Sequence, residues 1–233
     1  MVSATSGHQN KALCSLPDNL GTSLRELVLD KCKSLEIIPA SIGNLRNLKR
    51  LVLREAKALR SLPDSLANCH ELVELNLLKC IRFEGLPDGV GQLPALEDLF
   101  LAKCKTMTSL WKSGADFSLA LPRLATLDLK HCKNLQRLPA NLTAACPRLH
   151  VVWATDCAKL TQLPTGLTAQ LDMWDFTGCP AVITLPEHMP TQQHRATKKR
   201  LRREALDDES NKDHDTSVEA ETSTNPRKLV MAG

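Results

Sequence analysis

The chain has 233 residues, of which 42% are hydrophobic and 24% charged, and its formal net charge is +4. This length allows one substantial core, which must be mainly aliphatic because the chain has only four Phe and three Trp and no Tyr. No apolar run is long enough for a signal peptide or a membrane-spanning helix, so we expect a soluble intracellular protein without a membrane partner.

Nine cysteines are present, and most of them recur at one position of a repeating pattern. The segments LDKCKSLEIIP (29–39), LAKCKTMTSLW (101–111) and LKHCKNLQRLP (129–139) share one layout. A secreted disulfide framework is disfavoured because the number of cysteines is odd and the chain is not small. We therefore expect reduced thiols that serve the repeat.

Residues 1–12 precede the pattern and are predicted to form an N-terminal tail, and residues 13–190 carry the repeats. After an incomplete copy at Leu13, the block L-x-x-L-x-L-x-x-C starts at Leu24, Leu48, Leu72, Leu96, Leu124, Leu149 and Leu171. Its alternating apolar residues place every second side chain on one face, as a short strand requires. The last position of the successive blocks holds Cys32, Ala56, Cys80, Cys104, Cys132, Cys157 and Cys179.

A second element follows each strand and consists of an apolar residue, two variable residues and Leu-Pro or a close variant, as in Leu59 with Leu62-Pro63. Proline cannot donate to a strand ladder and forces a turn, so turns and short 3-10 segments are predicted here. The segment WKSGADFSLALP (111–122) departs from the pattern because Trp111 replaces the proline. The interval between strand starts grows there from 24 to 28 residues, which indicates a loop insertion.

One repeat cannot bury its own leucines, but parallel stacking at about 4.8 Å per strand gives each row of leucines a neighbour. The pattern therefore predicts an α/β solenoid with a parallel, concave sheet of about seven short strands. The convex side is predicted to consist of turns, 3-10 segments and short helical segments.

The strand block, the recurrent cysteine and the Leu-Pro-x-x-Leu segments, as in CKSLEIIPASIGNLRNLKRLVL (32–53), resemble the leucine-rich repeats of plant-type intracellular immune receptors and of plant intracellular Ras-group-related leucine-rich repeat proteins. The resemblance covers about residues 13–189 and implies a leucine-rich repeat horseshoe that recognises a protein partner in signalling or defence. The chain contains no G-x-x-x-x-G-K-[ST] motif, so the nucleotide switch of those receptors is not carried over. Bacterial effectors that join such repeats to a ubiquitin-ligase domain offer an enzymatic alternative, which is disfavoured because little chain follows residue 190.

The recurrent cysteines are expected to be structural, because a small buried thiol is a weak donor that fits a turn rich in backbone groups. Zinc sites usually contain close pairs such as C-x-x-C, and since none is present we predict no metal and no cofactor. Cys14, Cys69 and Cys146 fall outside the recurrent position and are better candidates for a reactive thiol, although no motif supplies a base. No catalytic residue is assigned.

Function is expected on the strand side chains that the core does not use. Aligned by repeat, they form three columns: Glu26, Arg50, Glu74, Asp98, Thr126, Val151 and Met173; Val28, Val52, Asn76, Phe100, Asp128, Trp153 and Asp175; and Asp30, Arg54, Leu78, Ala102, Lys130, Thr155 and Thr177. Aromatic anchors among polar residues are typical of interface hot spots. The predicted partner-binding residues are Arg54, Leu78, Phe100, Asp128, Lys130, Trp153 and Asp175. The alternative is a solvated face with scattered apolar residues.

Lysines flank the recurrent cysteines along one predicted edge: Lys31, Lys33, Lys57, Lys79, Lys103, Lys105 and Lys133. They indicate either a solubilising rim or a surface that attracts an acidic or phosphorylated partner. Nucleic acid is a less favoured partner, because residues 1–190 carry 21 basic against 18 acidic side chains and few aromatic residues for base stacking.

Residues 191–233 carry many charges of both signs and little apolar periodicity, which predicts a mostly disordered tail. The tail contains a compact basic cluster: Lys198, Lys199, Arg200, Arg202 and Arg203. Such a cluster is typical of nuclear localisation signals, so an import receptor is a candidate partner and the nucleus a candidate location beside the cytoplasm. The alternatives are a solvated tail and a polar cover for the last repeat.

Two functions follow from these patterns. The first is a non-enzymatic module that binds a protein on its concave surface. The second is a repeat-bearing effector or adaptor whose basic tail directs nuclear import or docks a second partner.

Overall fold

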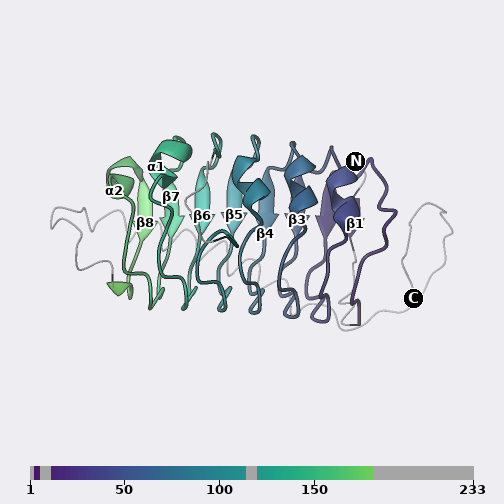
Figure 1. The fold of residues 1–233 in the computed structure, drawn as a ribbon, viewed down its shortest axis with the longest axis horizontal. Coiled ribbons are helices and arrows are strands. Elements are labelled where there is room, and N and C mark those ends of the chain that lie inside the picture. The colour runs from purple at the N-terminus through teal and green to yellow at the C-terminus, as the bar shows by residue number, and fades with distance from the viewer. Residues whose placement is uncertain (1–2, 6–11, 114–119, 181–233) are drawn as a thin grey trace, which may run out of the picture. The chain divides into compact units, whose positions relative to one another are not determined.

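The structure is a computed structural model that describes residues 3–5, 12–113 and 120–180 (Figure 1). These residues lie in one compact unit, Met1–Leu185. The charged tail, residues 191–233, and its basic cluster lie outside the described residues, so the interpretation of the tail stays a prediction.

Eight short strands form one parallel sheet whose order follows the chain (Figure 1). They are β1 (Ser3–Thr5), β2 (Glu26–Val28), β3 (Arg50–Val52), β4 (Glu74–Asn76), β5 (Asp98–Phe100), β6 (Thr126–Asp128), β7 (Val151–Trp153) and β8 (Met173–Asp175). Strands β2 to β8 coincide with the seven predicted blocks, and Leu27, Leu51 and Leu75 face one another in register. The predicted solenoid is confirmed.

Strand β1 was not predicted from the sequence. It lies in the segment assigned to the N-terminal tail and pairs with β2, Ser3 opposite Glu26 and Thr5 opposite Val28. Strand pairing uses backbone hydrogen bonds, which any sequence without proline can supply. The residues Ser-Ala-Thr therefore carry no leucine pattern by which the strand could be recognised.

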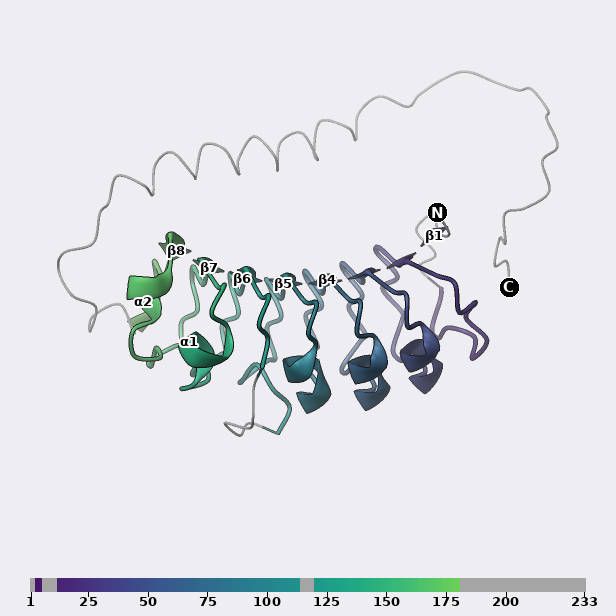
Figure 2. The ribbon, with the colours of Figure 1, turned by 90° about the horizontal axis from the view of Figure 1, so that it is seen from above.

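Short helical segments cover one side of the sheet (Figure 2). They are the 3-10 helices η1 (Ala40–Asn44), η2 (Asp64–Asn68) and η3 (Asp88–Gln92), and the α-helices α1 (Leu142–Ala145) and α2 (Leu167–Gln170). A proline precedes each 3-10 helix, and at Pro39 the backbone is extended, with φ −68° and ψ 153°. The Ile42 N–H then donates to the Pro39 carbonyl at 3.1 Å, which closes the first turn.

The apolar positions of the blocks form one continuous core along the array. The middle strand residues Leu27, Leu51, Leu75, Leu99, Leu127 and Val152 are at most 2% exposed. Burying a leucine side chain stabilises the fold by about 1.5–3 kcal/mol, whereas ordering a residue costs about 1–2 kcal/mol. A leucine stabilises the fold only where a neighbouring repeat covers it, so the repeats depend on one another. Trp111 is also buried, and its backbone forms an isolated parallel β-bridge with that of Leu86. This pairing explains how the repeat without proline keeps its register.

The turn after each strand contains a residue in the left-handed conformation. Two places after the last apolar strand position, the residues with positive φ are Lys31, Glu55, Lys79, Lys103, His131, Asp156 and Gly178. The N–H of this residue donates to the next repeat, as from Lys79 to the Ala102 carbonyl at 2.8 Å. The turns of neighbouring repeats are therefore joined by backbone hydrogen bonds.

Candidate protein-binding surface

The strand pairing places the first two predicted columns on the face of the sheet that the helices leave uncovered, and the third column lies in the turns that follow the strands. Asn76 faces Phe100, and Phe100 faces Asp128, as the repeat alignment predicts. Within the described unit, the sheet follows a shallow curve with the helices on its outer side (Figure 2). We call the uncovered side of the sheet the concave face.

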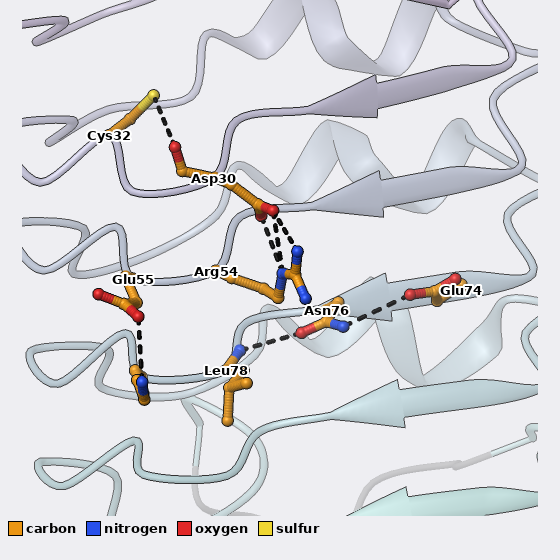
Figure 3. Close-up of polar contacts among 8 residues, drawn as sticks. Asp30, Cys32, Arg54, Glu55, Glu74, Asn76 and Leu78 are labelled. Atoms are coloured by element: carbon orange, nitrogen blue, oxygen red, sulfur yellow. Dashed lines mark hydrogen bonds and ion pairs between the residues drawn. The ribbon is translucent and has the colours of Figure 1, made fainter. Parts of the chain in front are cut away.

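Ion pairs between neighbouring strands hold the part of the concave face formed by β2, β3 and β4. Arg50 Nε donates to Glu74 at 2.7 Å, and its guanidinium lies 3.7 Å from Glu26. The hydrogen bond and the charge of Glu74 raise the pKa of Arg50. Arg54 Nε contacts both carboxylate oxygens of Asp30, at 3.1 and 3.0 Å (Figure 3). Each of these arginines thus forms an ion pair with a carboxylate on the same face.

Three polar residues of the central column fold the turn that follows their strand. In each case the side-chain oxygen accepts the backbone N–H two residues later, which is an Asx turn. The pairs are Asn76 with Leu78, Asp128 with Lys130 and Asp175 with Thr177, at 3.2, 3.0 and 2.9 Å. Figure 3 shows the first pair, in which the Asn76 amide also donates to Glu74 at 3.4 Å.

The part of the concave face formed by β5, β6 and β7 carries the two predicted aromatic anchors. Phe100 and Trp153 face Asp128 from either side, and both rings are partly exposed. Lys130 Nζ lies 3.2 Å from Asp128 Oδ2 and 5.7 Å from the centroid of the Trp153 ring. A cation over an indole face is attracted by the ring quadrupole. Phe100, Asp128, Lys130 and Trp153 therefore form one cluster, which we call the aromatic cluster.

The exposure of the two predicted carboxylates differs from the expectation. Asp128 is 9% exposed and Asp175 is 8% exposed, so neither presents much surface to a partner. Burial raises the pKa of Asp128, and the charge of Lys130 opposes this effect. Each carboxylate instead accepts the backbone N–H that closes the turn after its strand and therefore lies close to the backbone. The alignment of the repeats gives the column of a residue but not this hydrogen bond.

The structure brings only part of the predicted set together. Phe100 and Trp153 lie on the strands next to Asp128, and Lys130 lies in the turn after β6. Arg54 and Leu78 belong instead to the ion-paired region around β3 and β4. The contact between Lys130 and Trp153 was not predicted, although they occupy adjacent columns of adjacent repeats and that adjacency was the available signal.

Comparison with solved structures identifies the architecture. The leucine-rich repeat domain of the type III effector XopL is 28% identical, with a TM-score of 0.56, over 72% of this chain and 57% of that one. The fold is a leucine-rich repeat solenoid. A leucine-rich repeat protein of Leptospira interrogans (16% identity, TM-score 0.21, 79% of this chain and 73% of that one) and an internalin of Listeria monocytogenes (14%, 0.17, 67% and 68%) also match.

This leucine-rich repeat chain spans 57% of the length of the XopL domain structure. No protein-family model matches the chain. No curated protein matches it either.

The thiols of the leucine-rich repeats are structural donors. Each recurrent thiol from the third repeat on donates to a carbonyl of the preceding repeat: Cys80 to Leu53, Cys104 to Leu77, Cys132 to Leu101, Cys157 to Leu129 and Cys179 to Ala154, at 2.8–3.3 Å. Burial raises the pKa of Cys80 and of Cys132 to about 12. Such thiols stay protonated at neutral pH and are poor nucleophiles.

The structure disfavours Cys69 and Cys146 as reactive thiols. Both are fully buried, and burial raises the pKa of Cys69 to about 11 and that of Cys146 to about 12. They occupy the position that Leu45 and Leu93 fill in other repeats, where the residue ends a short helix, a 3-10 helix for Cys69 and the α-helix α1 for Cys146. A second cysteine register thus exists beside the first, and Cys14 is the exposed thiol.

Among residues 3–5, 12–113 and 120–180, no group of three His, Cys, Asp or Glu side chains is placed to hold a metal ion. None of the helices in the described part of the chain has the length and apolar composition needed to cross a bilayer.

Proposed function

We propose that this chain is a non-enzymatic recognition module that binds a protein partner on the concave face, with the aromatic cluster as the centre of the contact. The observation that carries the proposal is the placement of two partly exposed aromatic rings on either side of an internally paired Asp128. Leucine-rich repeat domains in general use their surface columns to bind proteins.

Energetics favour the aromatic cluster over the ion-paired region. Binding hot spots are rich in Trp, Tyr and Arg that are desolvated in the complex. Arg50 and Arg54 already contact carboxylates, so a partner would have to displace Glu74 or Asp30 before it could use them. Trp153 needs no such exchange, since its ring is already held by Lys130. Pre-organisation lowers the entropy that binding must overcome.

The test uses the full chain as bait, followed by affinity measurements on each protein that is captured. Trp153→Ala and Phe100→Ala are expected to weaken a specific partner by roughly 30-fold each, because a hot-spot truncation costs about 2 kcal/mol. Ile37→Ala is the matched control, because Ile37 is an exposed apolar residue (62%) outside the three columns. Unchanged affinity for the two aromatic variants, or equal loss with Ile37→Ala, would remove the aromatic cluster from the site.

A second candidate function is a repeat-bearing effector or adaptor. The similarity to the repeat domain of the type III effector XopL favours it. In this proposal the basic cluster (Lys198, Lys199, Arg200, Arg202 and Arg203) directs nuclear import or docks a second partner. A fluorescent fusion of the full chain should accumulate in the nucleus, and the same fusion with the five residues replaced by Ala should stay in the cytoplasm. Equal distribution of both fusions would refute import.

The biological process proposed for either function is immune-type or signalling recognition inside a cell. The support is the resemblance of the strand block and the recurrent cysteine to plant-type intracellular immune receptors. The test is to identify, by mass spectrometry, a captured protein whose binding the aromatic variants weaken. A partner that acts in immunity or signalling would support the proposed process.

A further inference from the structure

The turns that follow strands β2 to β6 form one edge of the sheet, seen as the loops below the strands in Figure 1. They comprise residues 30–34, 54–58, 78–82, 102–106 and 130–134, and backbone hydrogen bonds join them, as from Ala58 N–H to the Lys33 carbonyl at 3.1 Å. Lys33, Lys57, Lys105 and Lys133 occupy the same position of their turns and are exposed. We call this row of turns the lysine edge.

The lysine edge carries a strong excess of positive charge. Its five turns contain ten Lys and Arg residues against two carboxylates, Asp30 and Glu55. Two of the ten, Arg54 and Lys130, also belong to the concave face, where they pair with Asp30 and Asp128, and the other eight belong to the edge alone. Both carboxylates are already paired, Asp30 with Arg54 and Glu55 with Lys79 at 3.0 Å. The five turns that precede the same strands, residues 21–25, 45–49, 69–73, 93–97 and 121–125, hold four Lys and Arg residues and two carboxylates. The charge is therefore concentrated on one edge.

Six lysines at the centre of this charge have no carboxylate within ion-pair distance among the described residues, although the charges of Lys31 and Lys57 act on Glu55. Lys31, Lys33, Lys57, Lys103, Lys105 and Lys133 form no ion pair with residues 12–113 or 120–180. Stacking repeats brings these like charges within about 5 Å per strand along the edge, where they repel one another. A surface that serves solubility alone intersperses both signs. An aligned row of unpaired lysines instead matches a ligand of opposite charge.

We propose that the lysine edge binds an extended, acidic segment of a protein, separately from the partner on the concave face. From the turn after β2 to the turn after β6 the edge spans about 19 Å, four strand spacings of about 4.8 Å, which is the length of about six extended residues. Carboxylates of such a segment would meet the ammonium groups of successive repeats. The contact would be strongly weakened by salt, since these side chains are exposed.

A protein segment fits this edge better than a nucleic acid. Single-stranded nucleic acids bind where aromatic rings stack with the bases beside the basic groups. The five turns contain no Phe, Trp or Tyr, and eight of their ten basic residues are lysines.

The test compares two variants of the full chain that lose the same charge. The edge variant carries Lys33→Gln, Lys57→Gln, Lys105→Gln and Lys133→Gln. The control variant carries Arg25→Gln, Arg46→Gln, Arg123→Gln and Arg148→Gln, four exposed positions before the strands. The basic cluster of residues 198–203 is unchanged in both, so its contribution to binding cancels. The probes are a fluorescent oligoglutamate peptide and a fluorescent single-stranded oligonucleotide, at low and at physiological ionic strength.

We expect the oligoglutamate peptide to bind the natural chain at low ionic strength and the edge variant to lose about tenfold in affinity, while the control variant loses less than twofold. Circular dichroism should show that both variants remain folded. The proposal is overturned if the peptide does not bind, or if both variants lose equally, because net charge alone would then explain the binding. Tighter binding of the oligonucleotide, with its loss confined to the edge variant, would reassign the edge to nucleic acid.

Discussion

Six residues other than glycine adopt the left-handed conformation at one position of successive repeats, from Lys31 to Asp156. An L-residue pays roughly 1–2 kcal/mol for this conformation. The compensation is the hydrogen bond to the next repeat, such as Glu55 N–H to the Leu78 carbonyl at 2.8 Å. The recurrent cysteine lies one residue further on and ties the same turn to the repeat before it. Single residues thus join each turn to both neighbours.

The buried thiols should make the protein less stable as the pH rises into the alkaline range. Cys69, Cys80, Cys132 and Cys146 have a pKa of about 11 to 12 in the fold, against 9.0 without burial. The stability that these thiols contribute is therefore fully present below pH 9 and is lost as the pH rises towards 12. Between these limits each thiol lowers the free energy of unfolding by up to about 1.4 kcal/mol per pH unit. Chemical unfolding across this pH range measures the slope.

Replacing one thiol separates this effect from the titration of lysines. Cys80→Ala should reduce the alkaline slope by the contribution of one group, and Cys14→Ala, at an exposed thiol, should leave it unchanged. Identical slopes for the natural chain and Cys80→Ala would show that the buried thiols do not control alkaline unfolding.

At the scale of elements, the helical segments η1 and η2 pack closely against each other. The Ser65 hydroxyl in η2 donates to the Ala40 carbonyl in η1 at 2.6 Å. Gly43 in η1 allows this approach, because a Cβ at Gly43 would lie 2.5 Å from the Ser65 carbonyl oxygen and 2.8 Å from its Cβ. The glycine is required by the neighbouring repeat and not by its own backbone conformation.

Gly43→Ala should therefore destabilise the protein by about 1–3 kcal/mol, because η1 must move away from η2. Gly21→Ala is the matched control, since a Cβ at Gly21 has no atom within 4 Å, and it should change stability by less than about 1 kcal/mol. Thermal and denaturant unfolding of both variants measure the difference. Equal losses of stability in Gly43→Ala and Gly21→Ala would mean that η1 and η2 can move apart without a loss of free energy.

At the scale of the whole repeat unit, stability depends on contacts between neighbours. The fully buried Leu75 in β4 faces Leu51 and Leu99 on the adjacent strands. A repeat array behaves approximately as a chain of units with nearest-neighbour coupling. A destabilising substitution in a central repeat should therefore uncouple the unfolding of the repeats on its two sides.

Leu75→Asp should cost more than about 4 kcal/mol, because an unpaired carboxylate enters the core. The unfolding transition should broaden, and protease should cut first in the central repeats. Leu78→Asp is the control, since its partly exposed side chain lies on the concave face, and its midpoint should stay close to that of the natural chain. A natural midpoint for Leu75→Asp would contradict the continuous core.

The sequence by itself determined the repeat register, strands β2 to β8, the proline-led turns and the buried leucine rows, because each depends on local alternation and on the conformational limits of proline. Only the tertiary structure decided the second cysteine register, the burial of Asp128 and Asp175, the contact of Lys130 with Trp153 and the pairing of β1. These features depend on which repeat lies beside which side chain. The physical reason is that periodicity fixes the direction of a side chain, whereas its exposure and its partners depend on atoms contributed by residues some 24 positions away.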